Sequence, residues 1–257
     1  MDLDWGLRLD MAIFPVEIEL VLVRHGQTKW NVEHRYLGHT DLPLLPSVEE
    51  QLSKLQQLGR MFEKSENDKQ EVGKQGCENY ETRRAEVSDG FWRVFCSDLL
   101  RCRETLAYMA PSLEKVTVYD QRLREMNFGA WDGCTYEQLK DNSLYRSWID
   151  DPSKITPPEG ESWTQFDERL RSFLLDLGQA AETAIGHCAV MKNKGEVITN
   201  RALVVTHGGV IRNLLAQVVP DVTFYNAVAP SPGTAMVLKL RWQNRQWSAT
   251  TSDVLGI

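Results

Sequence analysis

Two histidines lie where a short buried strand gives way to a helix. His25 comes just after the mostly apolar run 18–23, and His207 comes directly after the run 202–206, which is rich in β-branched and apolar residues. Each histidine is followed by glycine. Turns of this kind direct backbone N–H groups and the positive end of a helix dipole toward one point, which makes an anion-binding site. An imidazole held beside a bound phosphoryl group can act as a nucleophile.

Arginines near these turns can supply the positive charge that a phosphoryl group needs. Arg24 precedes His25, and its planar guanidinium can bind two phosphoryl oxygens at once. Arg101 lies four residues before Thr105, on one face of a helix predicted to follow the strand 91–96. These groups would neutralise a dianionic phosphoryl group and hold it in line with an imidazole nitrogen.

An acid is the remaining group that such chemistry requires. A phosphoryl transfer to histidine expels an alkoxide, which needs a proton as it leaves, and a protonated carboxyl group is the usual donor. Glu125 follows a predicted strand and is the candidate. Each of these groups is common by itself as a packing or solvated residue, so the prediction depends on their occurring together.

The elements that must position these groups alternate between strands and helices. This order predicts an α/β fold, a three-layer α/β/α sandwich with a mostly parallel central sheet, in which ligands collect at the carboxyl ends of the strands. His25 and His207 would then lie at the same edge. The predicted strands are 18–23, 91–96, 116–119, 202–206, 234–242 and 246–251, the last two forming a hairpin around 243–245. Cap or capping-box residues predicted to start helices are Ser47, Asp98, Thr135 and Ser162, and a further helix covers 210–218.

Composition and charge exclude several classes of protein. The 257 residues are 42% hydrophobic and 25% charged, which excludes a collagenous, mucin-like or wholly disordered chain. The net charge of −7 argues against a non-specific nucleic-acid binder. No apolar run approaches the roughly 18 residues that span a bilayer, and the acidic residues of 1–19 are unlike a signal peptide. We therefore expect a soluble, cytoplasmic protein with no nucleic-acid or membrane partner.

The cysteines and histidines do not predict a metal site or a disulfide framework. The chain has five cysteines, an odd number, with no C-x-x-C spacing, and it has no H-E-x-x-H segment. The cysteines are expected to be reduced, and no cofactor is expected. They are Cys77, Cys96, Cys102, Cys134 and Cys188.

A single domain covering 1–257, with its core at about 17–250, is predicted because groups from both halves of the chain must meet at one phosphate. The segment 63–90 is polar and charged, and it predicts a surface loop in preference to a partner-binding arm. A smaller excursion is predicted at 186–200.

Five segments, in order along the chain, resemble the motifs of the histidine phosphatase superfamily, also called the phosphoglycerate mutase-like family. Residues 24–31 resemble its R-H-G-x-T-x-x-N motif, and 97–105 resemble S-D-L-x-R-x-x-x-T. Gln27 departs from the glutamate usual at that position. The other matching segments are 38–44, 123–133 and 205–208.

The resemblance implies a role for each matching residue. It implies that His25 is the nucleophile that forms a phosphohistidine, and that Glu125 donates a proton to the leaving group and later acts as base for water. It also implies that no metal takes part. The residues that it implies in phosphoryl binding are Arg24, Arg101, His207 and Gly208, with Thr28 and Asn31 in support.

The reaction predicted is hydrolysis of a small phosphorylated metabolite. The segment 125–136 resembles that of alpha-ribazole phosphatases and related broad-specificity bacterial phosphatases, and differs from the R-H-Y-G-x-L-x-G segment of the mutases. Alpha-ribazole 5′-phosphate is the candidate substrate. A phosphoglycerate mutase and a catalytically silent phosphate-binding or scaffolding protein remain the alternatives, and the oligomeric state is left open. Residues that either line the leaving-group side or pack are Tyr36, His39, Phe128 and Trp131.

Overall fold

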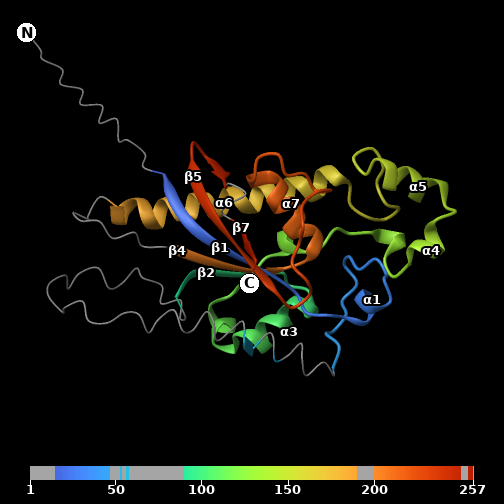
Figure 1. Cartoon of the computed structure of the whole chain (residues 1–257), viewed down its shortest axis with the longest axis horizontal. Coiled ribbons are helices and arrows are strands. Elements are labelled where there is room, and N and C mark those ends of the chain that lie inside the picture. Colours follow the sequence, from blue (N-terminus) through green and yellow to red (C-terminus); the bar gives the residue numbers. More distant parts are fainter. Residues whose placement is uncertain are drawn as a thin grey trace, which may run out of the picture.

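A mixed β-sheet forms the centre of the protein (Figure 1). The computed structural model describes residues 15–46, 53, 56–57, 90–189, 200–249 and 254–256. The strand order is β3-β2-β4-β1-β5-β6, and β7 pairs with β5. Strands β3, β2, β4 and β1 are parallel, as predicted, whereas β5, β6 and β7 add antiparallel pairs. The hairpin that joins β5 to β6 requires this antiparallel arrangement.

The predicted strands and helices that the structure describes occur in the predicted order, and α1, α5 and β7 are additional elements that the sequence analysis does not predict. The strands are β1 (Val16–Arg24), β2 (Phe91–Cys96), β3 (Val118–Tyr119), β4 (Asn200–Thr206), β5 (Ala235–Gln243), β6 (Gln246–Ser248) and β7 (Val254–Gly256). The α-helices are α1 (Lys29–Val32), α3 (Leu100–Met109), α4 (Tyr136–Leu139), α5 (Ser143–Asp150), α6 (Trp163–Ala189) and α7 (Gly208–Val218). Short 3₁₀ helices are η2 (Pro111–Val116), η3 (Gln121–Leu123) and η4 (Gly129–Trp131).

Strand β1 is buried on both faces because helices cover both sides of the sheet. The structure therefore has three layers. Leu20 and Leu22 belong to the apolar core beneath α6 and α7, while Val21 and Val23 belong to the core beneath α3. Successive side chains of a strand point to opposite faces, so the continuous apolar run serves both layers. Figure 1 shows α6 and α7 on one side of the sheet and α3 on the other. The predicted α/β/α fold is confirmed.

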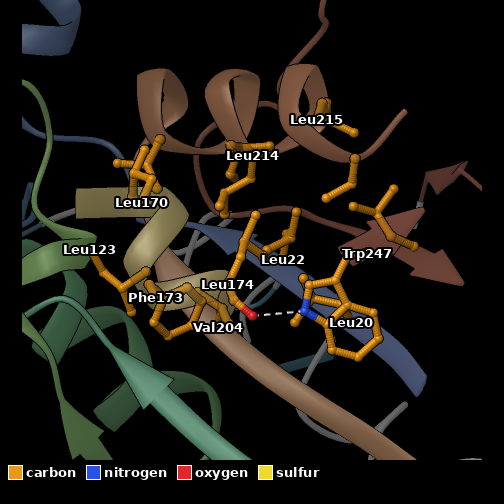
Figure 2. Close-up of a cluster of buried hydrophobic side chains, with 14 of the residues drawn as sticks. Leu20, Leu22, Leu123, Leu170, Phe173, Leu174, Val204, Leu214, Leu215 and Trp247 are labelled. Atoms are coloured by element: carbon orange, nitrogen blue, oxygen red, sulfur yellow. Dashed lines mark hydrogen bonds between the residues drawn. The ribbon is translucent and has the colours of Figure 1, made fainter. Parts of the chain in front are cut away.

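The apolar core under α6 and α7 holds both helices against the sheet. Leu170 and Phe173 of α6 and Leu214 of α7 pack over the sheet (Figure 2). The indole Nε1 of Trp247 donates to the carbonyl of Leu174 at 2.8 Å, which attaches the β5–β6 hairpin to α6. Because α7 is held on the sheet in this way, the turn from β4 into α7 is held too.

Several local predictions are confirmed. The side chains of Thr135 and Gln138 form a reciprocal capping box at the start of α4. Ser162 and Gln165 make the same pair of hydrogen bonds before α6. The predicted hairpin turns at Asn244 and Arg245, whose φ values are 53° and 61°. Positive φ at both central residues is typical of the type I′ turn that joins two antiparallel strands.

Three predictions are wrong in whole or in part. The strand predicted at 246–251 contains only Gln246–Ser248 among the described residues, and Ala249 lies outside it. Asp98 does not cap α3; its carboxylate binds Arg124, and the N–H of Leu100 donates to Asp41 at 2.6 Å. The strand predicted at 116–119 contains only Val118–Tyr119, because the chain enters a 3₁₀ helix at Pro111 before pairing with the end of β2.

Other predictions fall on residues that the structure does not describe. The helix after Ser47 is described only at residues 53, 56 and 57, which are helical. The charged segment 63–90, with Cys77, lies outside the described residues except for Gly90. The excursion predicted at 186–200 begins later than expected, because α6 continues to Ala189, and its residues 190–199 are also outside.

Two features of the described residues bear on the class of protein. No helix among them has the length and apolar character needed to cross a membrane. Cys96, Cys102 and Cys134 are free thiols, and no three histidine, cysteine or carboxylate side chains in the same described ranges are grouped as metal ligands would be.

Candidate active site

His25 lies at the carboxyl end of β1 with one ring nitrogen engaged. Its side chain is 4% exposed, and its backbone N–H donates to the carbonyl of Thr206 at 2.9 Å. Its Nδ1 donates to the carbonyl of Gly26 at 2.7 Å, so Nε2 is the nitrogen left without a proton. The N–H of Gly26 in turn donates to the hydroxyl of Thr105 at 2.9 Å, which joins this turn to α3.

His207 lies beside His25 although it comes from the other end of the chain. The two ring centroids are 5.1 Å apart, because β1 and β4 are adjacent parallel strands. His207 Nδ1 accepts a hydrogen bond from Arg101 Nε at 3.2 Å, so its Nε2 carries the proton and donates to Ser97 Oγ at 2.9 Å. The sequence analysis assigns no role to Ser97, although Ser97 is the first residue of the motif-like segment 97–105 and directly follows β2.

Arg101 is fully buried between α3 and the loop 38–40. Its Nη1 donates to the carbonyl of Thr40 at 3.0 Å and its Nη2 to that of Gly38 at 2.7 Å. With the bond to His207, three of its five N–H groups are used, which leaves two for an anion. Asp132 holds the loop by accepting from the backbone N–H groups of Gly38 and Thr40, at 2.6 and 2.8 Å. Asp132 was not predicted as a site residue either.

Arg24 lies against the first residue of α7. A Cβ atom on Gly208 would be 3.1 Å from the guanidinium carbon of Arg24, so the glycine permits this close approach. Arg24 Nη1 donates to the carbonyl of Pro230 at 3.2 Å, whereas its Nε is buried and meets no protein acceptor among the described residues. A buried donor of this kind suits an anionic acceptor.

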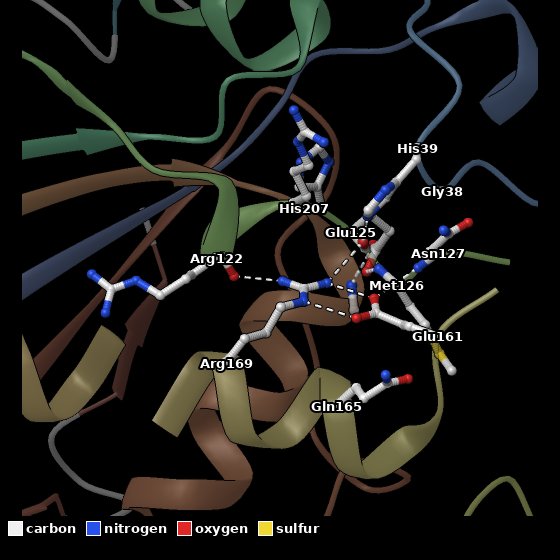
Figure 3. Close-up of polar contacts among 12 residues, drawn as sticks. Gly38, His39, Arg122, Glu125, Met126, Asn127, Glu161, Gln165, Arg169 and His207 are labelled. Atoms are coloured by element: carbon white, nitrogen blue, oxygen red, sulfur yellow. Dashed lines mark hydrogen bonds and ion pairs between the residues drawn. The ribbon is translucent and has the colours of Figure 1, made fainter. Parts of the chain in front are cut away.

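The carboxylate of Glu125 lies at the same helix end (Figure 3). Its Oε2 accepts from the N–H of Gly209 at 2.9 Å, and its Oε1 accepts from the N–H of Met126 at 3.0 Å. A Cβ atom on Gly209 would lie 2.3 Å from Oε1, so only glycine leaves room for the carboxylate here. The start of α7 therefore brings Glu125 and Arg24 to the turn that carries His207.

Burial sets the protonation state of the site. It lowers the pKa of both His25 and His207 well below the usual value, and the charge of Arg101 lowers them further. Burial also lowers the pKa of Arg24 and of Arg101, but a guanidinium stays charged at neutral pH. Two neutral imidazoles thus lie among permanent cations, an environment that favours binding of a dianion.

Cys102 is a neutral neighbour of this group. Its Sγ is 3.5 Å from Nε2 of His207, and burial raises the pKa of the thiol to about 12. The thiolate is the nucleophilic form of cysteine, and the Cys102 thiol stays protonated at neutral pH. The unprotonated imidazole nitrogen of His25 is therefore the more reactive group.

Other predicted residues have structural contacts. The side chains of Thr28 and Asn31 cap α1 by hydrogen bonding to each other and to backbone N–H groups. Their support of phosphate binding stays a prediction. Trp131 is buried and its ring packs against Tyr145 and Trp148, so Trp131 is a core residue.

The rings of Tyr36 and Phe128 are half-buried and their centroids lie 5.0 Å apart. His39 donates from Nε2 to the carbonyl of Glu125 at 3.0 Å. A leaving-group contact for these three residues stays a prediction.

Sequence comparison identifies the family. The family model described as "Histidine phosphatase superfamily (branch 1)" matches residues 20–69 and 70–253 of the chain. The chain belongs to this superfamily. Its members are phosphatases or mutases.

Curated relatives of this histidine phosphatase superfamily chain include two partial matches. Phosphoglycerate mutase-like protein 4 of Arabidopsis thaliana is 29% identical over 207 residues, which cover 79% of this chain and 72% of the plant protein. The bifunctional protein Rv2228c of Mycobacterium tuberculosis is 34% identical over 154 residues, which cover 59% of this chain and only 34% of that protein.

Solved structures share the fold. The alpha-ribazole phosphatase of Shigella flexneri superimposes with a TM-score of 0.62 at 22% identity, covering 90% of this chain and 94% of that one. The protein TTHB049 of Thermus thermophilus superimposes with a TM-score of 0.54 at 26% identity, covering 93% of this chain and all (100%) of that one.

Proposed function

We propose that this member of the superfamily is a metal-independent phosphomonoesterase that transfers the phosphoryl group of a small ester to His25 and then to water. The observation that carries the proposal is the state of His25. Its Nδ1 is fixed on Gly26, its pKa is lowered well below the usual value, and with Nε2 unprotonated it lies in the electrostatic field of the buried Arg101 and the half-buried Arg24. This is the form of imidazole that can attack phosphorus.

In the proposed first step, Nε2 of His25 forms a bond to phosphorus while the bond from phosphorus to the ester oxygen breaks. Arg24 and Arg101 hold the phosphoryl oxygens and balance their charge, with His207 and the backbone of Gly208 beside them. The positive end of α7 adds to this field. These interactions strengthen as the group becomes planar, so they lower the barrier.

Glu125 is the proposed proton donor and acceptor. As the ester oxygen leaves with its electron pair, the protonated carboxyl of Glu125 gives it a proton. The resulting carboxylate then takes a proton from water as the water oxygen attacks phosphorus, which releases inorganic phosphate and restores His25 and Glu125. One carboxyl group thus serves both half-reactions.

Hydrolysis is preferred over mutase activity because of the segment after Glu125. It continues as M-N-F-G-A-W-D-G, which resembles the phosphatase group and lacks the R-H-Y-G-x-L-x-G segment of the mutases. The fold shared with the Shigella flexneri alpha-ribazole phosphatase makes alpha-ribazole 5′-phosphate the first substrate to test. The likeness to the Arabidopsis mutase-like protein keeps mutase activity as the second candidate.

Product analysis separates hydrolase from mutase. We expect inorganic phosphate to be released in proportion to the 3-phosphoglycerate or other ester consumed, since Glu125 activates water in the second step. Phosphate and the two phosphoglycerate isomers are to be measured together. Formation of 2-phosphoglycerate without stoichiometric phosphate would refute hydrolysis as the main reaction.

Treatment with a metal chelator is expected to leave kcat/KM unchanged. The reason is that arginines and histidines supply the electrophilic help in the proposed mechanism. The protein is dialysed against chelator and assayed with and without added Mg²⁺, Mn²⁺ and Zn²⁺. A loss of activity that only an added divalent ion restores would contradict metal independence.

A further inference from the structure

The chain that carries Glu125 has little regular structure to hold it. Glu125 lies between η3, which ends at Leu123, and η4, which begins at Gly129. The buried backbone carbonyls of such a stretch need hydrogen-bond donors from elsewhere. One of them, that of Leu123, accepts from the hydroxyl of Thr206 at 2.8 Å.

Arg169 of α6 supplies donors to this segment (Figure 3). Its Nη1 donates to the carbonyl of Arg122, and its Nη2 donates to the carbonyl of Glu125 at 2.9 Å. One planar guanidinium therefore fixes the backbone both before and at the residue proposed as proton donor. A lysine has a single ammonium group and cannot reproduce this fork.

Glu161 holds Arg169 and the other end of the segment. Its Oε1 accepts from Arg169 Nη2 at 2.7 Å and its Oε2 from Arg169 Nε at 3.0 Å, a bidentate pair. The same Oε1 accepts from the N–H of Asn127 at 2.8 Å, while the N–H of Glu161 donates to the carbonyl of Asn127 at 3.0 Å. Glu125 is thus bracketed by contacts at 122, 125 and 127.

The pair is shielded from water. The side chains of Glu161 and Arg169 are 13% and 18% exposed, and the guanidinium carbon of Arg169 lies 4.8 Å from the centre of the Phe166 ring. A second ion pair on the same helix provides a contrast. Arg171 binds Asp167 at 2.8 Å but is 71% exposed, which is typical of a pair that contributes little.

We infer that Glu161 and Arg169 are positioning residues for Glu125, which hold its backbone so that the carboxyl group meets the leaving oxygen; this inference rests on the proposed function. Arg169 touches the carbonyl of Glu125 and not its carboxylate. The Glu161–Arg169 pair therefore affects the position of the proton donor. Displacing a reacting group by about 1 Å can cost about 100-fold in rate.

The test is Arg169→Met, assayed by single-turnover formation of the phosphorylated enzyme. Two esters are compared, p-nitrophenyl phosphate, whose leaving group needs little protonation, and glycerol phosphate, whose alkoxide needs a full proton. We expect about a 10- to 100-fold loss with glycerol phosphate and at most about a 3-fold loss with p-nitrophenyl phosphate. In a Glu125→Gln background, Arg169→Met should add no further loss that depends on the ester.

Controls separate this role from a merely structural one. Arg171→Met should stay within about twofold of the wild type on both esters, because its ion pair is exposed. Arg169→Lys should show the same dependence on the ester with a smaller loss, and it serves as the test if Arg169→Met does not fold. Equal losses on both esters, no loss, or additivity with Glu125→Gln would overturn the inference. An inactive wild type would refute the proposed function itself.

Discussion

Replacing His25 by alanine is expected to lower kcat by at least about 10⁴-fold on every ester and to abolish acid-labile phosphate on the protein. Alanine removes the nitrogen that forms the bond to phosphorus, and the nearby thiol of Cys102 stays protonated because burial raises its pKa to about 12. The measurement combines steady-state phosphate release with quenched trapping of labelled phosphate from the substrate.

His34→Asn is the matched control for this substitution. His34 is exposed and has a left-handed backbone with φ of 54°, which asparagine tolerates better than alanine. The control should keep wild-type activity and trapping. Full activity in His25→Ala would refute the nucleophile. Phosphate binding without turnover in the wild type would instead favour the silent scaffolding alternative.

The second large effect is expected for Glu125→Gln. Glutamine cannot protonate a leaving oxygen, so single-turnover phosphorylation by glycerol phosphate should slow by about 10²- to 10⁴-fold. Phosphorylation by p-nitrophenyl phosphate should slow far less. The phosphorylated enzyme should then accumulate, because glutamine also fails to activate water. Rapid-quench trapping of labelled enzyme measures both steps.

Gly209→Ala provides an independent check on the position of this carboxylate. The added Cβ would lie 2.3 Å from Oε1 of Glu125, so the side chain must move while its chemical identity stays the same. We expect the same dependence on the ester as in Glu125→Gln, with a smaller loss. Equal slowing of both esters by both variants would argue against the proton-donor role.

The strands that carry the histidines could be predicted because their signals are local. A mostly apolar run marks a strand buried on both faces, and a glycine just beyond the following histidine marks the turn. The structure places His25 and His207 at the predicted edge, with ring centroids 5.1 Å apart. The start of α6 after Ser162 could likewise be predicted from a four-residue capping box.

Contacts between distant segments could not be predicted. Aspartate is a favoured residue at the start of a helix, but the carboxylate of Asp98 binds Arg124 instead. The first N–H of α3 donates to Asp41, which lies on another loop. The roles of Ser97 and Asp132 depend equally on partners that only the folded chain brings near. Such choices depend on tertiary neighbours, which no local pattern encodes.

The place of β1 in the sheet has a consequence for how the protein is made. Its two neighbours are β4 and β5, which begin at residues 200 and 235, while β1 ends at residue 24. At ordinary rates of synthesis, about ten to thirty-five seconds pass between the synthesis of β1 and that of β4. During this time both edges of β1 lack their partner strands. Unpaired apolar edges invite association with other chains. The nascent chain therefore passes through an aggregation-prone stage that outlasts the synthesis of the second histidine, because one edge of β1 stays unpaired until β5 is made.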